Sequence, residues 1–298
     1  KAWIIDHMHA TVHDWIQAAR PHTWPNAFAP VIVGSGAAAF HFGFDLGHML
    51  LALLVAWSLI LGVNFANDYS DGIRGTDEDR SGPLRITASG KVNPTVVKLA
   101  AFGCFGVAAI FGLILTVSSG HVWMILIGII CILGAWFYTG GSHPYGYIGL
   151  GEVAVFIFFG LIAVLGTEYT QADHISWVGI CSAIGIGCIS AGVNLANNIR
   201  DIPTDEASGK MTLAVRIGDS RSRFLFQILV AMPFIMSFFI AGQTVFALIA
   251  LAALPLAVIA VMPVREGKTG QDLIPVLGLT GRCMIVWSVI TALVLALT

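Results

Sequence analysis

The chain has 298 residues, of which 57% are hydrophobic and only 11% are charged, and its formal net charge is −2. A soluble domain carries about 25% charged residues, so this composition excludes an ordinary soluble domain and is typical of a protein that crosses a membrane several times. The small net charge says little, because in such proteins the placement of the charges is what carries information.

Apolar stretches long enough to span a bilayer recur along the whole chain. A spanning helix needs about 20 mostly apolar residues. The sequence therefore predicts an all-α membrane protein in which residues 1–298 form a single transmembrane domain. The nine predicted spans are residues 27–44, 46–65, 96–117, 122–138, 150–166, 175–195, 224–240, 245–262 and 274–297.

Basic residues are confined to alternate connections. The connections after the first, third, fifth and seventh predicted spans contain no Lys or Arg. All fifteen basic residues lie in the N-terminal segment, in the other loops, or just inside the helices that flank those loops. Because basic loops stay in the cytoplasm, this pattern predicts a multi-pass protein of the cell membrane with a cytoplasmic N-terminus and a C-terminus outside. Loops 68–93 and 198–221 would then form cytoplasmic caps. No basic tract of the kind that binds nucleic acid is present, so no such partner is expected.

Two polar clusters interrupt this apolar chain at the ends of predicted spans. The stretches NFANDYSD, at residues 64–71, and NLANNIRD, at residues 194–201, share the pattern N-x-A-N-[DN]-x-x-D. They lie four predicted helices apart, which predicts an internal repeat in which the second and sixth helices are equivalent. Repeats in membrane proteins commonly form a site at their interface. One such cluster could serve only as helix caps or hydrogen-bond partners, but two at matched positions favour a functional site.

Helical spacing places the key groups of each cluster together. Asn64, Asp68 and Asp71 are at positions i, i+4 and i+7, on one face of a helix. The same spacing relates Asn194, Asn198 and Asp201. Pro203 is expected to interrupt the second helix, so Asp205 is expected to reach the cluster from the loop.

Carboxylates that converge at a membrane surface require a positive partner. Two unit charges about 6 Å apart repel by roughly 3 kcal/mol at an effective dielectric of about 20. Oxygen ligands without His or Cys suit Mg²⁺, which commonly binds carboxylates together with phosphate oxygens. The predicted Mg²⁺ ligands are Asn64, Asp68, Asp71, Asp201 and Asp205. The loops add the cations that a Mg²⁺–diphosphate site requires, namely Arg74, Arg80, Arg85, Lys91, Arg200, Lys210, Arg216 and Arg221.

Two other classes of function remain compatible with these clusters. A cation transporter could use them as its ion site, although its acids are expected at the bilayer midplane, whereas these lie at helix ends beside basic residues that suit an anion. A non-catalytic lipid-binding scaffold is the other class.

Aromatic residues of the central spans have two possible roles. They could serve only to pack the helices together, or they could line an apolar tunnel and stabilise a carbocation. They are Phe65, Trp136, Phe137, Tyr138, Phe156, Phe158 and Phe159.

The two clusters resemble the diphosphate–Mg²⁺ motifs of the UbiA-type membrane prenyltransferases, and the likeness covers almost the whole chain. The motifs read NDYSDGIRGTD and NNIRDIPTDEASGKMTLAVRIG. Further stretches resemble, more narrowly, the branch that prenylates 1,4-dihydroxy-2-naphthoate in menaquinone synthesis. These are ARPHTWPNAFAPVIVG, the first motif with its Gly75 and Asp77, YTGG followed by YIGLGEVAVFIFFG, and GKMTLAVRIG.

The resemblance implies a Mg²⁺-dependent enzyme of the lipid bilayer with a nine-helix UbiA-type fold. It would transfer the polyprenyl group of a polyprenyl diphosphate to 1,4-dihydroxy-2-naphthoate with loss of CO₂ and diphosphate, giving demethylmenaquinone. A sister enzyme that uses 4-hydroxybenzoate or homogentisate is the alternative within the family. Gly75 departs from the pattern of many 4-hydroxybenzoate relatives, which carry an acid there.

The resemblance also implies roles for individual residues. The expected catalytic residues are Asp68, Asp71, Asp201, Asp205 and Tyr138. The expected substrate-binding residues are Arg20, Asn64, Arg85, Lys91, Thr139, Asn194, Asn197 and Lys210.

Overall fold

The structure is a computed structural model that describes residues 10–75 and 85–298; Asp77 and Arg80 of the first predicted cap lie outside these residues. In chain order the α-helices are α1 (Val12–Ala18), α2 (Pro25–Phe40), α3 (Leu46–Arg74), α4 (Pro94–Ser118), α5 (Ile125–Phe137), α6 (Gly151–Val155), α7 (Gly166–Ala172), α8 (Trp177–Arg200), α9 (Ile202–Ala207), α10 (Leu213–Ile217), α11 (Asp219–Ile240), α12 (Leu254–Arg265) and α13 (Ile274–Leu297). The 3₁₀ and π-helical segments are η1 (Pro21–Thr23), η2 (Val122–Met124), η3 (Tyr145–Ile148), η4 (Phe156–Leu165), η5 (Val245–Ala253) and η6 (Gly270–Leu273).

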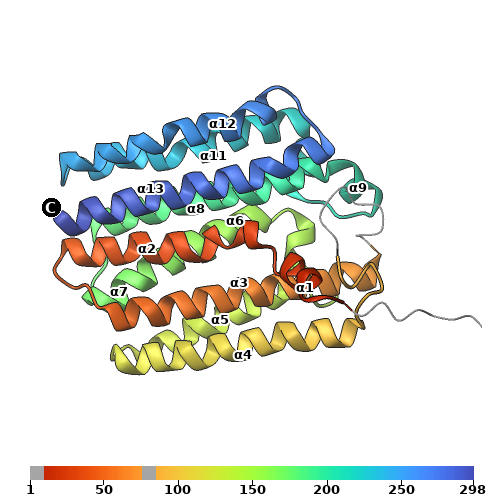
Figure 1. Ribbon diagram of the computed structural model, residues 1–298, viewed down its shortest axis with the longest axis horizontal. Helices are drawn as coiled ribbons and strands as arrows, with labels where there is room; N and C mark the ends of the chain where they lie inside the picture. The colour runs from red at the N-terminus through yellow and green to blue at the C-terminus, as the bar shows by residue number, and fades with distance from the viewer. Residues whose placement is uncertain (1–9, 76–84) are drawn as a thin grey trace, which may run out of the picture.

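Long apolar helices run side by side along the bundle (Figure 1). Among the described residues, seven helical stretches are long and apolar enough to cross a membrane: Leu46–Arg74, Pro94–Ser118, Gly151–Ala172, Trp177–Arg200, Asp219–Ile240, Val245–Arg265 and Gly270–Leu297. The first and fourth predicted spans form shorter apolar helices, Pro25–Phe40 and Val122–Phe137. Sixteen residues reach only about 24 Å, less than a hydrocarbon core of about 30 Å, so the count of nine spans stays a prediction.

Both polar clusters lie on helices, as their spacing predicts, but these helices extend beyond the ends of the predicted spans. The second predicted span stops at residue 65, but α3 continues for more than two further turns and ends where Gly75 adopts a left-handed φ of 73°. The sixth span likewise extends through its cluster to the end of α8. Pro203 interrupts it as predicted, in the first turn of α9, which carries Asp205; the expectation of a loop at Asp205 was therefore wrong. Helical backbone holds these side chains in a fixed register.

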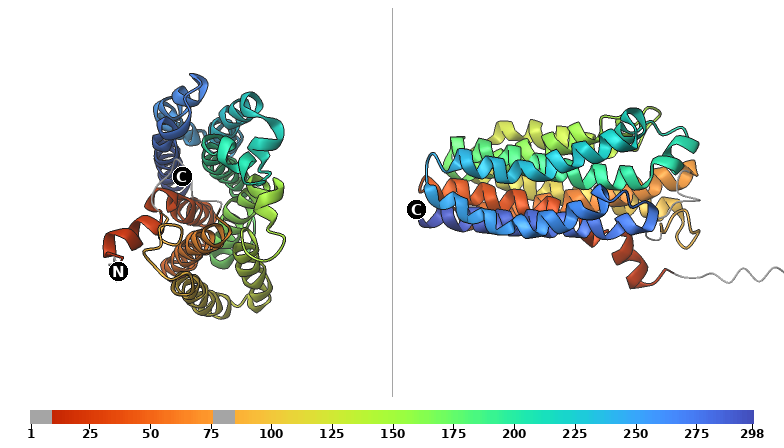
Figure 2. Two further views of the ribbon diagram at one scale, coloured as in Figure 1. Left: turned by 90° about the vertical axis from the view of Figure 1, so that its right-hand side faces the viewer. Right: turned by 90° about the horizontal axis from the view of Figure 1, so that it is seen from above.

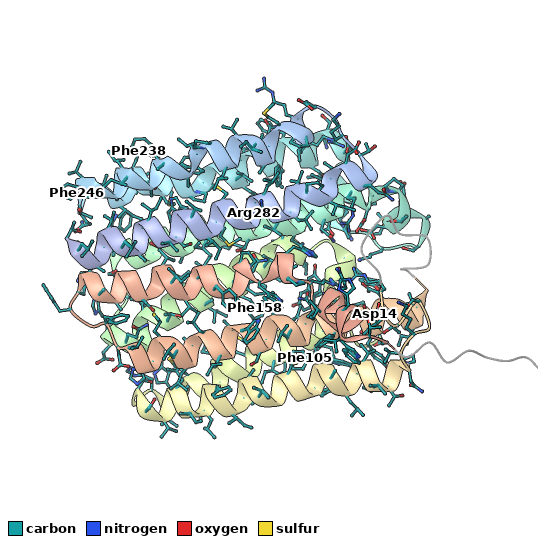
Figure 3. The ribbon with its side chains drawn as sticks, in the orientation of Figure 1. Asp14, Phe105, Phe158, Phe238, Phe246 and Arg282 are labelled. Carbon is teal, nitrogen blue, oxygen red and sulfur yellow. The ribbon has the colours of Figure 1, made fainter. Side chains whose placement is uncertain are left out.

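Helix α8 is the central element of the bundle, and most of its residues are buried. It packs against α11, α13 and η4, while α3 packs against α4 and α2 packs against α13 (Figure 2). The core around it includes the fully buried Trp287 and Phe226. Large apolar side chains also face outward, as Phe238 and Phe246 do at the periphery in Figure 3, with 61% and 56% of their surface exposed. Such an outer surface suits lipid rather than water.

Close approach of α8 to η4 depends on glycine. A Cβ atom built on Gly160 would meet the backbone of Gly187 and would lie 2.8 Å from the carbonyl oxygen of Ala183. Small residues of this kind let membrane helices pack backbone against backbone.

We expect Gly160→Ala to destabilise the protein by about 1–3 kcal/mol or more, because backbone atoms cannot yield to the added methyl group. Thermal unfolding in detergent measures the effect as a lower Tm. Gly106→Ala on α4 is the matched control, because its Cβ would have no heavy-atom neighbour within 4 Å. Equal Tm values for the two variants would contradict the packing argument.

Candidate active site

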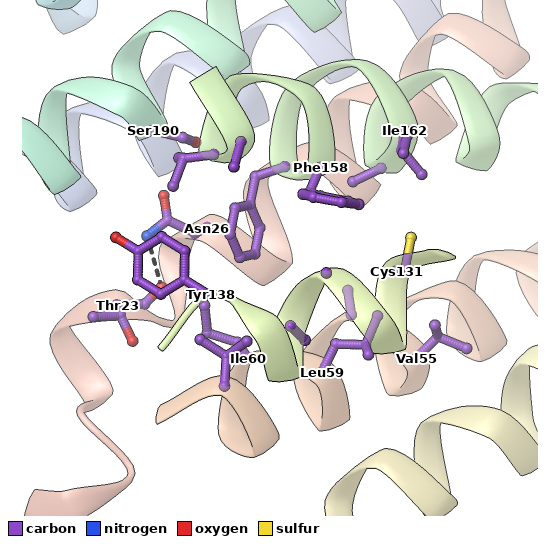
Figure 4. Close-up of a pocket in the computed structure, with 18 of the residues that line it drawn as sticks. Thr23, Asn26, Val55, Leu59, Ile60, Cys131, Tyr138, Phe158, Ile162 and Ser190 are labelled. Carbon is purple, nitrogen blue, oxygen red and sulfur yellow. Dashed lines mark hydrogen bonds between the residues drawn. The ribbon is translucent and has the colours of Figure 1, made fainter. Parts of the chain in front are cut away.

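A cavity of about 290 Å³ lies inside the bundle and has one polar and one apolar part. Its apolar lining includes Val55, Leu59, Ile127, Cys131, Phe158 and Ile162. Its polar lining includes Arg20, Thr23, Asn26, Asn64, Asn67, Arg85, Tyr138, Asn194, Asn197 and Arg200. Figure 4 shows Thr23, Asn26 and Tyr138 together at one side, with Cys131, Val55 and Ile162 at the other. Of the aromatic residues predicted to form a tunnel, only Tyr138, Phe158 and Phe159 line this cavity.

Asn64 is held at the cavity wall by the segment that precedes α2. Its Nδ2 atom donates to the carbonyl oxygen of Ala19 and to the Oγ1 atom of Thr23, at 2.9 Å each. Both amide hydrogens are used in this way, so one backbone carbonyl and one side-chain hydroxyl fix its orientation, and only 3% of the residue is exposed. Asn64 lines the cavity, and its predicted role in substrate binding stays a prediction.

Three arginines, Arg20, Arg85 and Arg200, contribute to the polar lining. Arg20 has a left-handed φ of 50°, which turns the chain between α1 and η1. Its Nε and Nη2 atoms are buried and have no hydrogen-bond partner within residues 10–75 and 85–298. Buried cationic donors without an acceptor are costly, so this arrangement favours an anionic ligand at the polar end of the cavity.

The two aspartates of α3 have separate partners. The carboxylate of Asp68 accepts the backbone N–H groups of Ile86 at 3.2 Å and Thr87 at 2.9 Å. Asp71 accepts the hydroxyl of Tyr147 at 2.5 Å. Both side chains therefore anchor the segments that cover this end of the bundle, and neither is part of the cavity lining.

The two aspartates that follow α8 are paired with cations. Asp201 accepts two bonds of 2.7 Å from the Nε and Nη2 atoms of Arg200, and Asp205 lies 3.7 Å from the Nζ atom of Lys210. The described part of the chain contains no group of three or more His, Cys, Asp or Glu side chains placed to hold a metal ion. Each of the four carboxylates thus has a partner within the chain, and their convergence on a metal ion stays a prediction.

The chemistry of this donor set nevertheless fits a hard divalent cation. The C-terminal ends of α3 and α8 lie beside α9 at one end of the bundle (Figure 1), and the four aspartates belong to these segments. Asn64 on α3 and Asn197 on α8 line the cavity. All of these groups offer oxygen, which Mg²⁺ prefers over nitrogen or sulfur.

Three predicted substrate-binding residues lie outside the cavity lining. Thr139 is buried behind it and donates its hydroxyl to Asn67 at 2.8 Å. Lys91 forms a 2.8 Å ion pair with Asp14, and this bond, together with hydrogen bonds from Thr11, lowers the pKa of Asp14 to about 2. Lys210 packs over the ring of Tyr147, 5.1 Å from its centroid. In this structure Thr139, Lys91 and Lys210 support neighbouring side chains.

Sequence reasoning missed Tyr147 and Glu152, and it named Arg200 only among the cations of the loops and not as a substrate-binding residue. Tyr147 connects the two clusters, because it bonds Asp71 and stacks beneath Lys210. Glu152 is an acid at the start of a long apolar stretch, only 5% exposed. An ionisable residue inside a membrane segment is a functional candidate by default, so Glu152 carried a signal that the sequence analysis did not use.

These features define an integral membrane protein with a cavity suited to a molecule that combines an anionic head group with an apolar tail. The sequence profile of the UbiA prenyltransferase family matches residues 27–296. The chain belongs to the UbiA prenyltransferase family, and with its apolar helices it is a multi-pass membrane protein.

Relatives and solved structures agree with this assignment. The chain is 51% identical, over 287 residues, to a Mycobacterium tuberculosis protein named 1,4-dihydroxy-2-naphthoate octaprenyltransferase, covering 96% of this chain and 98% of the relative. It is 39% identical over 215 residues to an Escherichia coli protein of the same name, covering 70% of each. A UbiA homolog from Archaeoglobus fulgidus, bound to GPP and Mg²⁺, has the same fold, with a TM-score of 0.67 at 14% identity over 95% of this chain and 99% of that one.

Proposed function

We propose that the protein transfers a polyprenyl group from polyprenyl diphosphate to 1,4-dihydroxy-2-naphthoate. The carbon–carbon bond forms at the ring position that loses its carboxylate as CO₂, and diphosphate leaves. The product is the quinol form of demethylmenaquinone. The names of relatives at up to 51% identity support this reaction. The structural observation that carries it is the cavity with buried Arg20 donors that have no partner among the described residues.

The two parts of the cavity suit the two parts of the donor. Arg20, Arg85 and Arg200 would bind the diphosphate, since guanidinium groups form strong charge-assisted hydrogen bonds with phosphate oxygens. The polyprenyl tail would lie along the apolar lining, beside Phe158 and Ile162. Where the bound substrates exclude water from this apolar part, an allylic cation formed there would be protected from hydrolysis.

The predicted metal residues would hold Mg²⁺ at the same end. They are Asn64, Asp68, Asp71, Asp201 and Asp205. When bound, the ion would withdraw charge from the diphosphate leaving group. Structures of a UbiA homolog from Archaeoglobus fulgidus with this fold contain Mg²⁺ together with GPP or DMAPP, which supports a divalent metal here.

We infer that the arginine-rich end faces the cytoplasm, with the N-terminus on that side and the C-terminus outside. Basic residues gather at that end, and connections at the other end, such as 41–45 and 173–176, contain none. Nine spans, an internal repeat and a single domain over residues 1–298 belong to the same proposal. The cytoplasmic caps of the protein would be residues 68–93 and 198–221, and the ends of α3 and α8 form part of them.

The test is prenyl transfer by the purified protein in detergent. Labelled polyprenyl diphosphate and Mg²⁺ are supplied with either 1,4-dihydroxy-2-naphthoate or 4-hydroxybenzoate. We expect a labelled naphthoquinol and release of CO₂ only with the naphthoate. Product from 4-hydroxybenzoate alone would assign the protein to the sister enzymes, and no product from either would reject the proposed transfer.

A further inference from the structure

Glu152 lies beside the cavity wall, at the start of α6, in a network of amide side chains. Its Oε1 atom accepts hydrogen bonds from the Nδ2 atoms of Asn194, at 3.1 Å, and Asn198, at 2.7 Å. Its Oε2 atom is buried and has no hydrogen-bond partner in the described part of the chain. The hydroxyl of Tyr138 donates to the Oδ1 atom of Asn194 at 3.2 Å. Asn194 therefore connects Glu152 to Tyr138.

The connection has a definite direction. Two donors converge on the Oε1 atom of Glu152, so this oxygen is an acceptor whether or not a proton resides on Oε2. Asn194 must then point its NH₂ group at Glu152 and its oxygen at Tyr138. The Tyr138 hydroxyl hydrogen is used in that bond, so the lone pairs of its oxygen are left for other partners. Asn194 and Tyr138 both line the cavity, whereas Glu152 does not.

The packing keeps this arrangement tight. A Cβ atom on Gly151 would lie 3.0 Å from the Tyr138 hydroxyl and 3.1 Å from the Nδ2 atom of Asn194. The start of α6 thus packs directly against the Tyr138 hydroxyl and the Asn194 amide. Asn64, which matches Asn194 in the other cluster, is also held through its NH₂ group by the segment preceding its neighbouring apolar helix. In both clusters the NH₂ group of the first asparagine is therefore bound by another segment of the chain.

We propose that Glu152 is a positioning residue that, through Asn194, turns the lone pairs of the Tyr138 oxygen toward the cavity, where they accept a hydrogen bond from a ring hydroxyl of the aromatic acceptor. The proposal rests on the proposed function and adds the group that orients the acceptor. It assigns Glu152 no contact with either substrate.

The kinetic test separates orientation from charge. Glu152→Leu removes the acceptor for both amides, and we expect kcat/KM for the aromatic acceptor to fall at least tenfold while KM for polyprenyl diphosphate changes less than twofold. Glu152→Gln keeps a carbonyl oxygen in the Oε1 position and is expected to stay within threefold of the unsubstituted protein. If Glu152→Gln loses as much as Glu152→Leu, the charge acts and the orientation proposal is overturned.

Glu168 supplies a matched control in the same membrane segment. It is fully buried, its Oε1 atom accepts from Ser176, and its Oε2 atom also has no partner among the described residues. It does not line the cavity. Glu168→Leu therefore imposes a similar structural change away from the site, and its acceptor kinetics are expected to stay within threefold. A tenfold loss in that variant as well would overturn a specific role for Glu152.

A double-mutant cycle tests whether Glu152 acts through the Tyr138 hydroxyl. In a Tyr138→Phe background, Glu152→Leu is expected to cause less than a twofold further loss. An undiminished tenfold loss in that background would show that Glu152 acts by another route. Glu152→Asp withdraws the acceptor by one methylene while remaining polar. Glu152→Asp replaces Glu152→Leu if the leucine variant does not fold, and it should change the acceptor kinetics and the ¹⁹F shift in the same direction.

A measurement that does not depend on enzyme turnover tests this proposal separately from the proposed function. With 3-fluorotyrosine placed at position 138 of the full chain in detergent, the ¹⁹F resonance reports the hydrogen bond of its hydroxyl. We expect Glu152→Leu to shift it and Glu168→Leu to leave it unchanged. Absence of a shift overturns the positioning role. If the unsubstituted protein transfers no prenyl group, the proposed reaction fails, and the ¹⁹F comparison still decides the connection.

Discussion

Asp68→Ala and Asp201→Ala should each reduce prenyl transfer at least a hundredfold while the protein still inserts into the membrane. These carboxylates are the expected metal ligands of the two clusters, and a lost oxygen ligand removes charge stabilisation of the departing diphosphate. Initial rates with saturating donor and acceptor measure the effect. Retention of more than a tenth of the original rate would contradict the metal assignment for that residue.

The structure identifies what must be controlled in this experiment. Asp68 also binds the backbone at Ile86 and Thr87, so its removal could loosen the covering segment. Asp68→Asn keeps an oxygen acceptor for that segment but loses the charge, and should be nearly as inactive as the alanine variant. Asp219→Ala removes a carboxylate that is bound by Arg223 at 2.7 Å, outside the cavity lining, and should remain active. If that control is equally inactive, loss of an arginine-paired carboxylate alone explains the Asp201 result.

Removal of divalent metal is expected to have a comparably large effect. EDTA should stop turnover, and excess Mg²⁺ should restore it, because the expected ligands are oxygen atoms and the diphosphate itself binds the ion. The measurement is the initial rate before chelation, after it and after Mg²⁺ addition, with Ca²⁺ as a comparison ion of larger radius. Turnover that continues in EDTA would argue that Arg20, Arg85 and Arg200 alone neutralise the leaving group.

Much of the candidate site was predictable because it depends on local pattern. Asn64, Asn194 and Asn197 were predicted from a repeated motif, and the structure places all three at the cavity wall. Arg20 and Arg85 came from the family resemblance and also line the cavity. The hydrogen-bond partners of Asn64 and Asn194 could not be predicted, because Ala19, Thr23 and Glu152 are distant in sequence from these asparagines.

Thr139 and Lys91 show the opposite case. Each stands in or near a motif, yet their partners, Asn67 and Asp14, are 72 and 77 residues away and hold them outside the cavity lining. A motif states which residue types are present, but it cannot state which of them face the ligand and which face each other. That choice is made by packing between helices.

The sequence by itself determined the membrane class, seven of the nine predicted spans, the alternating placement of basic loops and the two matched polar clusters. These properties depend on residue type and spacing along one helix or loop. Only the tertiary structure decided which groups the aspartates contact and that Glu152 reaches Asn194 across 42 residues. These outcomes depend on contacts between distant segments, whose geometry is set when α8 packs against its neighbours.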